Sequence, residues 1–196
     1  MNDVWVCCGV IRAEMEELCR RGLIGGRLLF LDSMLHMNPQ RLEEALVAEL
    51  ATLASPANRI VLVYGDCSAS MLDLVRRFGV SRTPIINCGQ LLVGRARYRE
   101  LMREGAFLVL PEWAPRWKQI MRTELGLERT TARDLMRENR SVLVYLDTGL
   151  VPVPVECLED FSAYTGLPLR IETVSLDVMC AALLAARSEL DGLIPG

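Results

Sequence analysis

Residues 60–79 read IVLVYGDCSASMLDLVRRFG, and this stretch decides the fold. The first five residues are apolar or aromatic without a break, which is typical of a strand that is buried on both faces. After a short loop, Ser70–Phe78 has the spacing of an amphipathic helix, and Gly79 stands where that helix should stop. A strand followed by a short loop and a helix predicts one half of a βαβ unit in a parallel sheet.

The same alternation of apolar runs and helical patterns extends over the whole chain. Seven runs are predicted to be strands: Val4–Cys8, Arg27–Leu31, Ile60–Tyr64, Pro84–Asn87, Phe107–Leu110, Val142–Leu146 and Leu169–Val174. The clearest helical patterns lie between them: Arg12–Leu23, Pro39–Ala54, Ser70–Phe78 and Gln90–Gly105. We therefore predict an α/β fold, with a largely parallel, Rossmann-like, doubly wound sheet and helices on both of its faces.

The length of the chain bounds its domain organisation. A chain of 196 residues is expected to form a single α/β domain, 1–196. Within it, residues 113–141 carry a helical pattern broken near Gly126, which indicates a helical insertion or a lid. The last two βα units, 142–196, are the candidate for a small second lobe, although nothing in their composition sets them apart.

Composition and charge exclude several classes of protein. With 51% hydrophobic and 24% charged residues, the chain can bury a large core. A net charge of -3 argues against a general nucleic-acid surface, which normally shows a basic excess. No run approaches the roughly 20 apolar residues that span a bilayer, and Met1-Asn2-Asp3 does not open a secretory signal. We expect a cytoplasmic protein that binds neither nucleic acid nor membrane.

The chain has seven cysteines and one histidine, His36. In the cytoplasm thiols are kept reduced, so an odd number of cysteines indicates thiols or metal ligands rather than a disulfide framework. Imidazole is the commonest protein ligand of zinc and many other transition metals. With one imidazole in the chain, any transition-metal site must be rich in thiolates.

Three cysteines follow predicted strands or end them, next to a small residue and just before a helix: Cys8, Cys67 and Cys88. Ligands of open parallel sheets bind at the carboxyl ends of the strands, and the field of helix N-termini is expected to lower the pKa of thiols there. The three thiolates could share zinc, copper(I) or an iron–sulfur cluster and leave one position open. Alternatively, they pack as small apolar side chains. Cys7 should face away from Cys8, and its role is open.

Three further residues are candidates for substrate contacts. His36 precedes a predicted helix and is either a loop residue near a cap or part of the site. Asp66 is either a turn residue or an acceptor beside the ligands, and Arg82, before the fourth predicted strand, is a candidate for anion binding. The chain contains no G-x-G-x-x-G, no P-loop motif and no C-x-x-C, so a dinucleotide, P-loop or thioredoxin-like site has no support.

An ordered series of short motifs runs over nearly the whole chain: Cys8-Gly9-Val10, Leu35-His36 with Pro39, Tyr64-Gly65-x-Cys67, Cys88 followed by Leu91-Leu92-x-Gly94, Arg97-Tyr98 and Leu146-Asp147-Thr148-Gly149. In this order and spacing the series resembles the bacterial and archaeal domain-of-unknown-function family 1638. The resemblance implies that cysteines belong at these three positions. Members often occur beside corrinoid-dependent methyltransferase systems, which implies a role in methyl transfer or cofactor handling.

The chain departs from this family pattern in two places. Ile86-Asn87 stands where the family usually has His-Asp before the third cysteine, and Ser68-Ala69 stands where it usually has glycine and asparagine after the second. Both changes lie next to cysteines of the predicted site, so its metal or substrate can differ from those of other members.

Taken together, these features predict a metal- or cluster-dependent enzyme with Cys8, Cys67 and Cys88 as ligands of zinc or an iron–sulfur cluster. The expected substrate is a small thiol, methyl-group or sulfur-bearing molecule in corrinoid or one-carbon metabolism. The alternative is a non-catalytic accessory protein that handles a corrinoid or a metal for a methyltransferase, and a third reading is an ordinary small-molecule enzyme with packed cysteines. Candidate partners are a corrinoid protein, a methyltransferase and a second copy of the chain in a homodimer.

Overall fold

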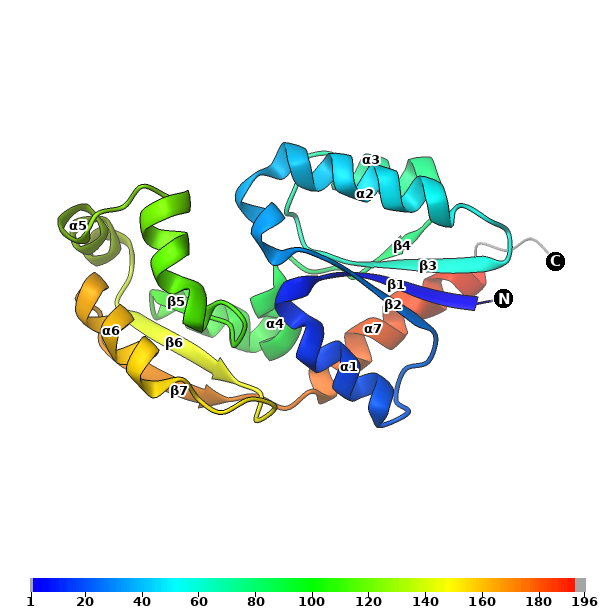
Figure 1. Ribbon diagram of the computed structural model, residues 1–196. Coiled ribbons are helices and arrows are strands. Elements are labelled where there is room, and N and C mark those ends of the chain that lie inside the picture. The colour runs from blue at the N-terminus through cyan, green and yellow to red at the C-terminus, as the bar shows by residue number, and fades with distance from the viewer. Residues whose placement is uncertain (1, 193–196) are drawn as a thin grey trace. The chain divides into compact units, whose positions relative to one another are not determined.

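The strands form two parallel sheets in the computed structural model, which describes residues 2–192 (Figure 1). The strands are β1 (Asn2–Cys8), β2 (Arg27–Leu31), β3 (Asn58–Val63), β4 (Ser81–Arg82), β5 (Ala106–Val109), β6 (Val142–Asp147) and β7 (Leu169–Thr173). The α-helices are α1 (Arg12–Arg20), α2 (Pro39–Leu53), α3 (Met71–Phe78), α4 (Cys88–Arg103), α5 (Arg129–Asn139), α6 (Val155–Thr165) and α7 (Asp177–Glu189). The predicted α/β class with parallel strands is confirmed.

The chain divides into two compact units. The first comprises Met1–Leu91 and Leu176–Gly196, and the second comprises Leu92–Ser175. Met1 and residues 193–196, which end the predicted lobe 142–196, lie outside the described part of the chain. The strands belong to two sheets rather than one, because an apolar run specifies a buried strand but not its neighbour.

The first unit contains a four-stranded sheet in the order β2-β1-β3-β4, and all three strand pairs are parallel. Helices α2 and α3 lie on one face of this sheet, and α1 and α7 lie on the other (Figure 1). The strand order reverses between β1 and β3, and the helices that follow these two strands cover opposite faces. Such a switch point leaves a crevice at the carboxyl ends of the strands, where open α/β sheets bind their ligands.

The second unit is built on the three-stranded sheet β5-β6-β7. The predicted insertion, residues 113–141, contains the helical connection between β5 and β6: a short 3-10 helix (Ala114–Arg116), a π-helix (Gln119–Glu124) and α5. Trp117 from this connection stacks on Phe161 of α6 with ring centroids 5.0 Å apart. Both rings belong to the buried core of the unit, together with residues of β5, β6 and α5.

One predicted strand is wrong. Pro84–Asn87 forms a loop, and the fourth strand is the two-residue β4 before it. The backbone groups of Ile86 explain the difference, because they bond outside any strand ladder. Its N–H donates to the side chain of Gln90, and its carbonyl accepts from the N–H of Asp66. The other six predicted strands lie within two residues of their observed bounds.

At Gly65 the loop after β3 lies in close contact with the loop before α4. A Cβ atom on Gly65 would collide with the carbonyl group of Ile86 and with the Cα atom of Asn87. The next residue, Asp66, donates its N–H to the Ile86 oxygen at 2.8 Å. Only glycine permits this approach of the two backbones, so Gly65 sets the separation of the two loops.

No helix within residues 2–192 combines the length and the apolar character that crossing a membrane requires.

We predict that Gly65→Ala lowers the free energy of unfolding by at least about 2 kcal/mol, because the added methyl group has to displace backbone rather than a flexible side chain. The matched control is Gly25→Ala, where an added Cβ meets no heavy atom within 4 Å. Urea unfolding followed by circular dichroism compares the two variants. Equal midpoints for them would show that the two loops do not meet as described.

Candidate functional site

Cys8 is the last residue of β1 and lies at the switch point of the first unit. Its side chain is buried, with 4% of its surface exposed. The register of β1 and β3 pairs Cys7 with Val63, so Cys8 and Tyr64 leave the two neighbouring strands side by side. The sheet therefore brings Cys8 next to the loop that carries the second cysteine.

Cys67 and Cys88 lie in the two chain segments that come into close contact at Gly65, the loop after β3 and the start of α4. Cys67 is half-buried in the loop after β3, and Cys88 is the buried first residue of α4. The side chain of Asn87 accepts the N–H of Gln90 at 2.9 Å, which caps the start of this helix. The Cys88 thiol is hydrogen-bonded to the Cys8 thiol. The structure thus brings together the three predicted ligand-bearing segments.

The pKa values of two thiols of this site, Cys67 and Cys88, are raised. The pKa of Cys88 is raised well above its ordinary value, first by the hydrogen bond with Cys8 and then by burial. Burial, followed by the charge of an ionised Cys8, raises the pKa of Cys67 to about 11. The expectation that these pKa values are lowered is wrong, because the hydrogen bond with Cys8 and then burial raise the pKa of Cys88, and burial raises that of Cys67.

Ligand geometry for one metal ion is not preformed at this site. Within residues 2–192, no three side chains of His, Cys, Asp or Glu are arranged as ligands of one metal ion.

Arg82 and Asp66, two of the predicted substrate contacts, bind each other. A nitrogen of the Arg82 guanidinium lies 2.8 Å from an Asp66 carboxylate oxygen, with 12% and 60% of the respective side chains exposed. Arg82 lowers the pKa of Cys67 while Asp66 raises it, although burial is the larger cause. The pair therefore stands beside the second cysteine, and its two charges largely cancel.

His36 lies in a 3-10 helix, Ser33–Met37, that follows β2 at the same edge of the sheet. Burial lowers the pKa of its imidazole, which favours the neutral ring near pH 7. Gly9, just after Cys8, lies so close to the carbonyl of Leu31 that a Cβ there would contact it at 2.8 Å. This close approach places the ends of β1 and β2 together.

Tyr64 lies at this site, although the sequence placed it only in a family motif and not among the predicted site residues. Only 1% of its side chain is exposed, and within the described chain its hydroxyl oxygen has no hydrogen-bond partner. Its pKa is raised by burial and then by the charges that Cys8, Cys7, Cys88 and Cys67 would carry as thiolates. The signal in the sequence is an aromatic residue with a hydroxyl group at the end of a run of Ile, Val and Leu.

Cys7 is fully buried, and burial raises its pKa well above the ordinary value. Three other cysteines lie on helices: Cys19 on α1, Cys157 on α6 and Cys180 on α7. Cys180 is buried and the other two are half-buried.

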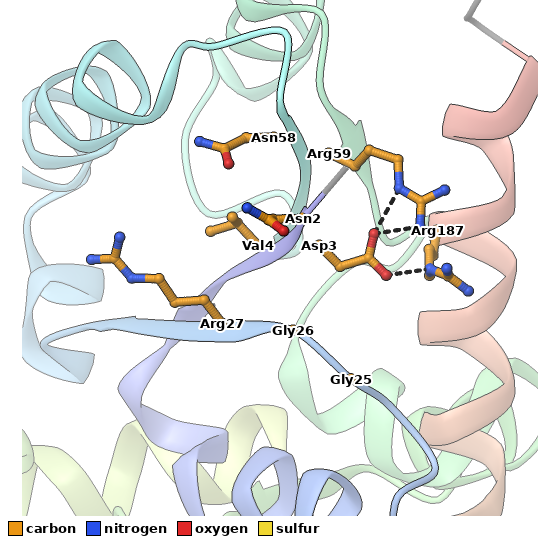
Figure 2. Close-up of a pocket in the computed structure, with 9 residues that line it drawn as sticks. All are labelled: Asn2, Asp3, Val4, Gly25, Gly26, Arg27, Asn58, Arg59 and Arg187. Carbon is orange, nitrogen blue, oxygen red and sulfur yellow. Dashed lines mark hydrogen bonds and ion pairs between the residues drawn. The ribbon is translucent and has the colours of Figure 1, made fainter.

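A polar pocket of about 670 Å³ lies at the opposite, amino-terminal edge of the same sheet (Figure 2). Asp3 of β1 stands in it, and both of its carboxylate oxygens are bound by arginines. Arg59 of β3 donates to Asp3 at 2.7 Å, and the Nε atom of Arg187 on α7 lies 2.6 Å from the other oxygen. Arg59 also binds Asp191. These ion pairs connect β1 and β3 with α7 and the turn that follows it. Their role is therefore structural.

We predict that iodoacetamide alkylates Cys67 of metal-free protein at pH 8 about 10-fold more slowly than it alkylates an exposed thiol, because little thiolate is present at that pH. Since the folded-state pKa is the higher one, the rate should rise as the pH approaches 11. Mass spectrometry of the labelled peptide measures it, with urea-unfolded protein as the control. A folded-state rate equal to the unfolded rate at pH 8 would show that burial does not hold the proton on Cys67.

Comparison with known proteins gives one match. The model of the family described as "Protein of unknown function (DUF1638)" matches residues 30–183, a range that includes Tyr64, Cys67 and Cys88 and begins after Cys8. No curated protein and no solved structure shows significant similarity. The family match covers more than half of the chain and confirms the resemblance inferred from its motifs. The chain therefore belongs to the DUF1638 family of proteins of unknown function.

Proposed function

We propose that the protein binds a zinc ion or an iron–sulfur cluster through the thiolates of Cys8, Cys67 and Cys88. The observation that carries the proposal is the convergence of these three residues at the switch point of one parallel sheet. Thiolates without imidazole suit zinc and iron–sulfur clusters and are poor ligands for magnesium or calcium. Electrostatic coupling among the three thiols supports their proximity.

The surroundings of the thiols also fit a bound group. Two buried thiolates and one half-buried one would need compensating positive charge; a bound ion would supply most of it, and Arg82 lies close enough to favour the Cys67 thiolate. The Tyr64 hydroxyl is a buried polar group without a protein partner, which is a common mark of an absent ligand.

Three protein ligands leave one position for a substrate. The bound metal would act there as a Lewis acid that lowers the pKa of a substrate thiol. The proposed substrate is a small thiol, methyl-group or sulfur-bearing molecule.

Asp66 and Arg82 lie beside this position and can orient a polar substrate through exchange of their ion pair. His36, held neutral by burial, can accept a hydrogen bond from it. A corrinoid protein or a methyltransferase as partner follows from the family resemblance alone.

A non-catalytic role is the second candidate, in which the site carries a metal or a corrinoid for a methyltransferase. One observation favours it: the carboxylate beside the thiols, Asp66, is already paired with Arg82, so it is a poor general base. Turnover of methyl donors and thiols by metal-loaded protein separates the two roles, since an accessory protein transfers its cargo but does not turn over.

We predict that protein purified without oxygen carries one zinc ion or one iron–sulfur cluster per chain, and that Cys67→Ser loses it. Cys19→Ser, which removes a half-buried thiol on α1, should keep it. Binding to metal-free protein should release about three protons per zinc ion, because the thiols are protonated beforehand. Metal analysis, optical spectra and calorimetry in two buffers measure these quantities. Metal-free protein that also fails to take up zinc or cobalt(II) would contradict the proposal.

A further inference from the structure

Strand β7 leaves one edge of the second sheet open. It is the outer strand in the order β5-β6-β7 (Figure 1). Pro168 and Val174, which flank β7, bond to β6 through their backbone groups. Because the direction of these groups alternates along a strand, three residues turn their N–H and C=O groups to the outer edge: Leu169, Ile171 and Thr173. No hydrogen bond to these outward groups is found within residues 2–192.

An apolar side chain stands in the middle of this open edge. Ile171 is 46% exposed, and among the exposed large apolar residues of the described chain it is the one that lies in a strand. An open, apolar strand edge is a template for pairing with another strand, and proteins often protect such edges with proline or by shortening the strand. β7 has five residues and no proline. The edge is therefore suited to a partner strand.

Two opposite charges flank this apolar residue. Arg170 and Glu172 lie on the face of the strand opposite to Ile171. The Nε atom of Arg97 lies 2.7 Å from a Glu172 oxygen, and Glu104 lies 2.7 Å from Arg170. These ion pairs hold both charges on one face while 40% of the Arg170 side chain and 20% of the Glu172 side chain stay exposed. A partner strand would thus meet one positive and one negative charge at fixed positions.

The sequence of β7, Leu-Arg-Ile-Glu-Thr, is complementary to itself. In an antiparallel pair centred on Ile171, Arg170 lies opposite Glu172 of the partner subunit. A centre at Arg170 or at Glu172 would instead put two like charges opposite each other, which is destabilising. With the centre at Ile171, the outward backbone groups take the hydrogen-bonded positions, and the charges take the positions where side chains are closer. Charge and backbone direction therefore favour the same register.

We propose that β7 pairs with β7 of a second copy of the chain around a two-fold axis at Ile171. The sheet β5-β6-β7 of one copy then continues into β7-β6-β5 of its partner. Each outward residue exchanges backbone hydrogen bonds with the residue opposite, and Ile171 packs against Ile171 of the partner subunit. A two-fold interface requires such self-complementarity, and two-fold dimers are the commonest symmetric assemblies of soluble proteins.

Charges placed at Ile171 supply the test, because this residue meets its own copy. Ile171→Lys and Ile171→Glu should each weaken dimerisation at least about 10-fold, since like charges then oppose each other. An equimolar mixture of the two variants should recover a dimer, because lysine then lies opposite glutamate. The matched control is Leu135→Lys, which charges an apolar residue of α5 in the same unit that is 45% exposed, and it should dimerise as the wild type does.

Sedimentation equilibrium of the full chain, with a reductant to prevent disulfide-linked dimers, measures these affinities, and circular dichroism checks that each variant is folded. A second variant tests the backbone: Thr173→Pro removes an outward N–H and no bond to β6, so it should weaken the dimer and keep the fold. Wild-type protein that is monomeric at about 100 μM would overturn the inference. So would wild-type affinity in Ile171→Lys, a mixture of the Lys and Glu variants that stays monomeric, or an equal loss of dimer in Leu135→Lys.

Discussion

The hydrogen bond from the N–H of Asp66 to the carbonyl of Ile86, made possible by the absence of a side chain on Gly65, holds the candidate site together. It joins the segment leaving β3 to the segment entering α4, two parts of the chain that share no strand ladder at this point. The parallel pairing of β1 with β3 then brings Cys8 to the same edge. This backbone contact fixes the loop that carries Cys67 relative to the segment that carries Cys88.

Burial sets the chemistry of the thiols gathered there. Burial raises the pKa of Cys67, and the hydrogen bond with Cys8 followed by burial raises that of Cys88, so both thiols favour their protonated form. At the proposed site a metal would bind by displacing these protons, so its affinity is expected to rise with pH.

Much of this architecture could be predicted from the sequence, because long apolar runs such as Ile60–Tyr64 specify buried parallel strands and parallel strands end at a common edge. The division into two sheets could not, since strand periodicity does not encode which strands pair. The loop Pro84–Asn87 looked like a strand because it follows the apolar pattern, while its bonds to Asp66 and Gln90 depend on tertiary contacts. The pKa direction of the thiols also depends on burial, which a sequence does not show. Tyr64 was predicted as the last residue of a strand rather than as a site residue, because strands commonly contain tyrosine.

The central claim is that three cysteine sulfurs bind one metal centre, and X-ray absorption at the edge of the bound metal tests it most directly. For zinc-loaded protein, the account predicts a first shell with at least three sulfur atoms about 2.3 Å from the metal. Replacing Cys67 by serine should remove one sulfur from that shell or release the metal. A shell of nitrogen and oxygen alone, or metal retained after Cys8, Cys67 and Cys88 are all replaced by serine, would contradict it.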